Sequence, residues 1–182
     1  MTTFISILRG INVGGHNPVN METLRLLYAE LGFSYIQHYI QSGNVIFNSE
    51  STDTRFLEKT ICEKILAVYG WIVPVHILTK EELSNALQNN PFINDSSKDS
   101  SFMHLTFLST QPEKELVEKI SEGNYLPDEF LINGKTIYLY CPNGYGRTKL
   151  TNSFFENKLK LIATTRNIKT VRELLFLADK TY

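Results

Sequence analysis

The order of secondary-structure patterns in the first 79 residues is the feature that most constrains the fold. An apolar strand pattern over residues 4–8 is followed by a helix pattern that starts at the capping residue Asn20 and ends at Gly32. Two strand patterns joined through Ser42-Gly43, a second helix pattern over 53–69 and a fourth strand pattern over 72–78 complete the series. The order βαββαβ predicts a ferredoxin-like unit, in which two helices cover one face of a four-stranded antiparallel sheet.

The rest of the chain repeats most of this order. A helix pattern over 80–90 and a polar stretch over 94–101 predict a connecting helix and a flexible linker. Strand, helix, strand and strand patterns follow, the last two joined by Asn133-Gly134, and then a helix over 152–161 and a final helix over 171–178 without a fourth strand pattern. We therefore expect an α+β fold of two ferredoxin-like βαββαβ-type units in tandem, the second incomplete: residues 1–79, a connection over 80–100, and residues 101–182.

Charge and cysteine content indicate a cytoplasmic protein without a membrane segment. The formal net charge is −1, so the molecule as a whole exerts no strong field toward nucleic acid or an anionic membrane. Cys62 and Cys141 lack CxxC spacing, no signal region precedes the first strand, and no apolar run reaches the roughly 18 to 20 residues that span a bilayer.

A glycine-rich loop over residues 9–16 is the first candidate for ligand binding. Backbone N–H groups of such a loop can bind an anion, which makes Arg9, Asn12, Gly14 and Gly15 candidates. The loop is neither a P-loop nor a dinucleotide fingerprint, so no cofactor is expected. The alternative is that the glycines only permit a tight connection.

The turn of the first hairpin is the second candidate, because it carries the polar side chains of Gln41, Ser42 and Asn44. The flanking aromatics Tyr39 and Phe47 either stack on RNA bases or pack in a core.

The third candidate is the C-terminal segment, which is basic. Residues 147–180 hold 8 Lys or Arg against 3 Asp or Glu, whereas residues 1–146 hold 10 against 16. Arg147, Lys149 and Arg166 are therefore candidates for a phosphate or nucleic-acid contact, with a solvated helix face as the alternative.

Catalytic signals are weaker than binding signals. The four histidines are scattered without metal-ligand spacing, so no metal is expected. His16 is the candidate general acid or base, because it is the histidine that lies in a glycine loop.

Three segments together resemble a bacterial family called domain of unknown function 1697. They are residues 8–15 (LRGINVGG), residues 39–47 (YIQSGNVIF), and residues 163–167 (ATTRN) with 170–172 (TVR). The resemblance implies a pair of ferredoxin-like units and no established activity. His16 stands where a lysine is common in the family, and Ile168 where a tryptophan is common, so an anion bound through that lysine in relatives would bind here more weakly and with a pH dependence.

Three functions follow from these patterns. The first is binding of a phosphate-bearing ligand, either a nucleotide, a phosphometabolite or nucleic acid, in the cleft between the two units. The second is a hydrolase or transferase acting on a phosphorylated small molecule in the same cleft. The third is a structural or interaction protein that forms a homodimer through exposed edge strands.

Overall fold

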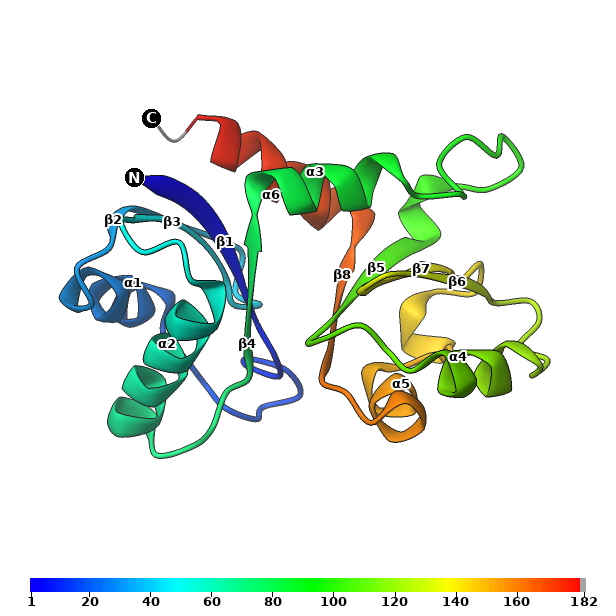
Figure 1. Ribbon diagram of the computed structural model, residues 1–182, viewed down its shortest axis with the longest axis horizontal. Helices are drawn as coiled ribbons and strands as arrows, with labels where there is room; N and C mark the ends of the chain where they lie inside the picture. Colours follow the sequence, from blue (N-terminus) through cyan, green and yellow to red (C-terminus); the bar gives the residue numbers. More distant parts are fainter. Residues whose placement is uncertain (181–182) are drawn as a thin grey trace. The chain divides into compact units, whose positions relative to one another are not determined.

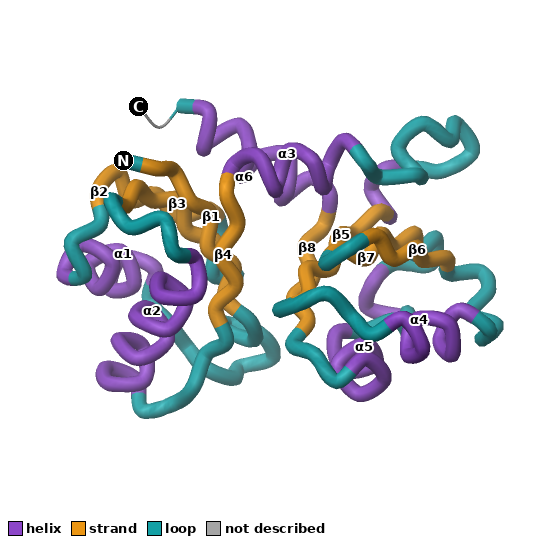
Figure 2. Tube along the Cα trace, in the orientation of Figure 1, coloured by secondary structure: helices purple, strands orange, loops and turns teal. Residues whose placement is uncertain are grey.

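The computed structural model describes residues 1–180, which divide into two compact units. Unit 1 consists of residues 1–84 and the C-terminal segment from Glu173, and unit 2 consists of residues 85–172. The division falls inside a helix within the 80–100 connection, and the C-terminal segment groups with the first unit in sequence. Each unit is a four-stranded antiparallel sheet with two helices on one face, as Figures 1 and 2 show.

Unit 1 has the predicted βαββαβ order. Its elements are β1 (Thr2–Leu8), α1 (Met21–Glu30), β2 (Ser34–Tyr39), β3 (Asn44–Ser49), α2 (Thr54–Tyr69) and β4 (Val75–Thr79). The strand order β2-β3-β1-β4 is that of a ferredoxin-like fold, with both neighbours of β1 antiparallel to it.

Local signals set the ends of the two helices of unit 1. The side chain of Asn20 accepts a hydrogen bond from the Thr23 N–H, and that of Asp53 accepts one from the Phe56 N–H. These caps satisfy N–H groups that have no partner inside the helix. Gly70 ends α2 in the left-handed conformation at φ 81°.

The core of unit 1 lies between the two helices and one face of the sheet. Leu24 and Tyr28 of α1 are buried there with Phe47 of β3, and the rings of Tyr28 and Phe47 meet edge to face at 5.4 Å. The Tyr28 hydroxyl shares a buried 2.8 Å hydrogen bond with Ser6. Phe56 and Val68, which fit the helical register of α2, are about half exposed, so the apolar stripe of this helix is narrower than its sequence suggests.

Unit 2 repeats the topology of unit 1. Its elements are η1 (Ser100–Phe102), β5 (Met103–Leu108), α4 (Lys114–Ser121), β6 (Glu129–Asn133), β7 (Thr136–Tyr140), η2 (Tyr145–Arg147), α5 (Asn152–Leu159) and β8 (Ala163–Asn167). The sheet order β6-β7-β5-β8 corresponds strand for strand to that of unit 1. The helices α3 (Lys80–Gln88) and α6 (Ile168–Asp179) each contribute residues to both units.

The prediction that the second unit is incomplete was wrong, because β8 supplies its fourth strand. This strand pairs with β5 along its whole length, from Ala163 opposite Leu108 to Asn167 opposite His104. Its five residues are mostly polar, and Thr165 is held by 2.6 Å hydrogen bonds to Thr106 and Asn152. An edge strand of this kind has no apolar alternation for a sequence pattern to detect.

Across residues 1–180, no helix has the length and apolar character to cross a membrane. In the same range, no three His, Cys, Asp or Glu side chains are grouped so that they could hold a metal ion.

Candidate functional site

The structure brings the glycine-rich loop and the first hairpin turn together in unit 1. The Leu8 N–H donates to the Gly43 carbonyl at 2.8 Å. The Asn12 side-chain amide donates to the carbonyls of Val19 (2.9 Å) and Gln41 (2.7 Å). Its oxygen accepts from the Val19 N–H at 2.8 Å. Asn12 therefore ties the loop to the turn through its bond to Gln41 and closes the loop on itself through its two bonds to Val19.

Gly43 and Asn44 also have structural roles in this contact. A Cβ added at Gly43 would lie 2.6 Å from Ile11 Cδ1 and 2.7 Å from Leu8 Cβ, so no side chain fits. The buried Asn44 amide donates to the Tyr39 carbonyl at 3.2 Å and to Ser42 Oγ at 2.9 Å. Asn12 and Asn44 use their side-chain amides to hold the backbone, and Ser42 accepts a hydrogen bond from Asn44, which accounts for these motif residues without a ligand.

The tip of the loop is exposed to solvent. Gly14 and Gly15 adopt positive φ of 58° and 78°, and His16 beside them is exposed. The backbone N–H of Arg9 donates to the Pro74 carbonyl at 2.9 Å, and Arg9 is half-buried. Gly14, Gly15 and His16 are therefore accessible to solvent, whereas Arg9 is partly covered.

Two of the predicted basic residues meet in a pocket of unit 2. Arg147 and Lys149 line a cavity of about 430 Å³, within the roughly 300–1,000 Å³ typical of small-molecule sites. We call it the basic pocket; its lining residues are Tyr125, Leu126, Pro127, Asp128, Asn143, Arg147 and Lys149. Within residues 1–180, neither the Arg147 guanidinium nor the Lys149 ammonium forms an ion pair.

Arg166 lies apart from the basic pocket, on β8. Its guanidinium donates to the Thr165 carbonyl at 2.9 Å, and the residue does not line the cavity. The predicted site residues therefore fall into three groups: those of the loop and turn in unit 1, Arg147 with Lys149 in the basic pocket, and Arg166 on a strand of unit 2.

A buried threonine joins the two segments that form the basic pocket. Thr148 donates its hydroxyl to Asp128 Oδ2 at 2.6 Å and accepts the Leu150 N–H at 3.0 Å. Since Thr148 lies between Arg147 and Lys149 in the chain, this bond fixes the segment that carries both cations against the segment that carries Asp128. Asp128 and Asn143 belong to no recognisable motif, so their place beside Arg147 could not be predicted from the sequence.

A second cavity of about 550 Å³ adjoins the basic pocket. We call it the side cavity; it shares Tyr125, Leu126 and Asp128 with the basic pocket and is also lined by Phe92, Asp95, Asn124, Glu129, Phe130 and Leu131. Gly123 is part of its wall, and a Cβ there would lie 2.3 Å from the Tyr125 hydroxyl. The absence of a side chain at Gly123 is therefore what lets the Tyr125 ring lie between the two cavities.

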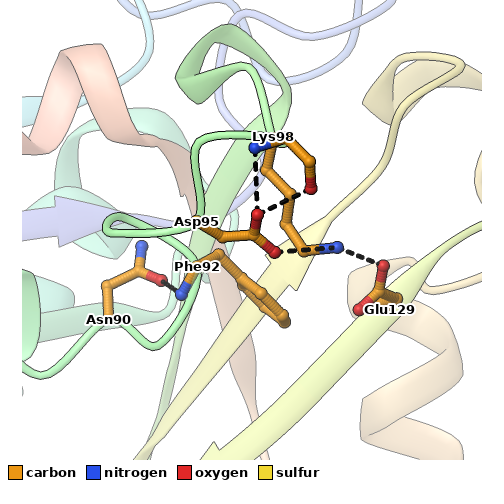
Figure 3. Close-up of polar contacts among 6 residues, drawn as sticks. Asn90, Phe92, Asp95, Lys98 and Glu129 are labelled. Carbon is orange, nitrogen blue, oxygen red and sulfur yellow. Dashed lines mark hydrogen bonds and ion pairs between the residues drawn. The ribbon is translucent and has the colours of Figure 1, made fainter.

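Lys98 is the one cation among the lining residues of the side cavity, and acidic partners hold it. Its ammonium bonds the Glu129 carboxylate, lies 3.9 Å from Asp95 Oδ2 and sits 4.5 Å from the centre of the Tyr140 ring, an arrangement partly drawn in Figure 3. The hydrogen bond to Glu129 raises the pKa of Lys98. The hydroxyl and N–H of Ser97 both donate to Asp95 and lower the pKa of its carboxyl.

Two other titratable groups of unit 2 are poor candidates for catalysis. Burial lowers the pKa of His104, whose ring stacks on Tyr145 at 4.8 Å. Burial raises the pKa of the Cys141 thiol to about 11, so it stays protonated at neutral pH and is a weak nucleophile.

Fold and site together define an α+β protein of two ferredoxin-like units, one of which carries a small cation-lined pocket. A family model described as "Protein of unknown function (DUF1697)" matches residues 1–138, and the chain belongs to this family. The match ends before Asn143, Arg147 and Lys149, so these three pocket residues lie outside it.

Among solved structures, the chain is similar to the conserved bacterial protein SP0830 from Streptococcus pneumoniae. The two share 24% identity at a TM-score of 0.70, with 97% of this chain and 98% of that chain covered. This likeness supports the fold. No curated protein matches the chain.

Proposed function

We propose that this protein binds a phosphate-bearing small molecule in the basic pocket of unit 2. The observation that carries the proposal is that Arg147 and Lys149 line one cavity without forming ion pairs within the described chain. An anion with several acceptor oxygens matches the fork of N–H donors on Arg147 and the three donors of Lys149.

The remaining polar groups of the basic pocket favour a ligand that is more than a bare anion. The exposed Asn143 amide adds a neutral donor beside the two cations. The Asp128 carboxylate repels a phosphate placed against it but accepts hydrogen bonds from ligand hydroxyls, since Thr148 engages one of its oxygens. A phosphate ester that carries hydroxyl groups satisfies both sides of the pocket.

The proposal is tested by isothermal titration calorimetry, in which the protein is titrated with inorganic phosphate or with ribose 5-phosphate. Replacing Arg147 or Lys149 by alanine is expected to raise the Kd of both compounds by about 10-fold or more, which corresponds to the loss of one charge-assisted hydrogen bond. Lys158→Ala is the matched control, because it removes the same charge from an exposed site on α5 outside the pocket.

Two results would contradict the proposal. One is equal binding by the Arg147→Ala, Lys149→Ala and Lys158→Ala variants, which would show attraction by net charge alone. The other is the failure of both phosphate compounds to bind the parent protein at millimolar concentration.

A further inference from the structure

We infer that the ligand of the basic pocket is a nucleoside 5′-monophosphate with an amino-bearing base, whose nucleoside part occupies the side cavity. The inference rests on the proposed function, because it takes the phosphate position at Arg147 and Lys149 as given. It adds what the rest of the ligand is and which residues recognise it.

The position of the side cavity is the first argument. The two cavities share Tyr125, Leu126 and Asp128, so they lie on either side of the same short segment. A ligand anchored by its phosphate at Arg147 has the side cavity as a neighbouring space for its remaining part. At about 550 Å³ this cavity is larger than the basic pocket, which suits a bulky group rather than a second phosphate.

The charges of the side cavity form the second argument. Asp95, Asp128 and Glu129 supply carboxylates, and Lys98 is already engaged by Glu129 and Asp95. Hydrogen bonds from Ser97 lower the pKa of the Asp95 carboxyl. A surface of this kind repels phosphate and accepts hydrogen bonds, so it selects a moiety rich in O–H and N–H donors.

Ribose and an amino-bearing base present those donors. The vicinal ribose hydroxyls are suited to Asp128, which belongs to both cavities and therefore lies between the phosphate position and the base position. Exocyclic amino groups of adenine, cytosine or guanine are suited to the Asp95 carboxylate, whereas the corresponding position of uracil is a carbonyl that a carboxylate repels.

Aromatic and apolar side chains supply the third argument, since a base needs a face on which to stack. Tyr125 is partly exposed in the wall shared by the cavities, and Phe130 meets it edge to face at 5.5 Å. Leu126 and Leu131 are 77% and 44% exposed beside them. Stacking of a base on such a surface contributes about 1–3 kcal/mol in single-stranded nucleic-acid sites.

The test compares AMP and UMP with ribose 5-phosphate and inorganic phosphate by isothermal titration with the full chain. AMP is expected to bind about 10-fold or more tightly than ribose 5-phosphate and than UMP, since a hydrogen bond to a charged group is involved. Asp95→Asn is expected to lower the preference for AMP over UMP, with the part that comes from the larger stacking area of adenine remaining, and to leave ribose 5-phosphate binding unchanged. Asp99→Asn is the matched control, because Asp99 is an exposed aspartate that likewise accepts an N–H two residues ahead but does not line the cavity.

The outcomes separate this inference from the proposed function. If inorganic phosphate and ribose 5-phosphate bind through Arg147 but AMP binds no more tightly, the nucleotide inference is overturned and the proposed function stands. If none of the four compounds binds, both are overturned. If AMP is preferred equally by the parent, Asp95→Asn and Asp99→Asn proteins, recognition of the amino group by Asp95 is overturned.

Discussion

Replacing Gly43 by alanine tests the structural account of the loop and turn in unit 1. The substitution has two costs: alanine must adopt φ +73°, and its Cβ must approach Ile11 and Leu8 to 2.6 and 2.7 Å. The left-handed conformation costs about 1–2 kcal/mol for a residue other than glycine, and crowding of a packed core costs about 1–3 kcal/mol. We expect the free energy of unfolding to fall by about 2–5 kcal/mol.

Gly10→Ala is the matched control, because Gly10 has a φ of +71° but nothing within 4 Å of an added Cβ. It carries the conformational cost without the crowding, so a loss of about 1–2 kcal/mol is expected.

The assay is urea unfolding followed by tryptophan fluorescence. Trp71 is the single tryptophan of the chain and packs against the core of unit 1, so its signal reports on that unit. If Gly43→Ala lowers the free energy of unfolding by no more than Gly10→Ala does, the close approach of Leu8 and Ile11 is not what requires glycine at this position.

Three further predictions concern single polar groups. Asn12→Ala leaves three backbone groups without their partner and should cost about 1–3 kcal/mol in the Trp71 assay, whereas no loss would show that water replaces these bonds. Burial raises the pKa of Tyr28, so the contribution of this side chain to stability is lost as pH rises above about 10. The Tyr28→Phe variant should therefore lose less melting temperature between pH 9 and 11 than the parent protein does. Parallel curves for the two proteins would contradict this. Burial lowers the pKa of His104, so this histidine is protonated in the unfolded state before it is protonated in the folded state, and stability falls as pH drops below about 6.5. The His104→Gln variant should therefore lose less melting temperature between pH 7.5 and 5.5 than the parent protein does. An unchanged slope would show that His104 does not cause the pH dependence.

The motifs that stand out most in the sequence have structural roles in unit 1. Asn12 clamps the glycine-rich loop to the turn, and Gly43 permits the close contact between them. The residues that line the basic pocket of unit 2 carry weaker signals, because single Arg, Lys and Asp residues are common on any surface. The sequence pattern therefore predicted the parts of the chain that build the fold better than the parts that line the basic pocket.

Much of the fold follows from the sequence because its causes are local. The caps Asn20 and Asp53 and the stop at Gly70 act within one helical turn, so they are readable without knowledge of the rest of the chain. Glycine turns between apolar runs likewise indicate the hairpins. The order βαββαβ in unit 1 and the tandem arrangement could thus be predicted from residue patterns alone.

Tertiary structure decided the features whose causes lie far apart in the chain. The polar strand β8 forms because its backbone pairs with that of β5. The paired residues are far apart in the chain, since Thr106 and Thr165 are separated by 59 residues. The basic pocket exists because Thr148 bonds Asp128 across 20 residues and so joins two loops. Sequence alone determined the helices, hairpins and their order, since short-range sterics and hydrogen bonds suffice for these. Only the folded chain determined which loops meet, since that depends on long-range pairing that no local pattern encodes.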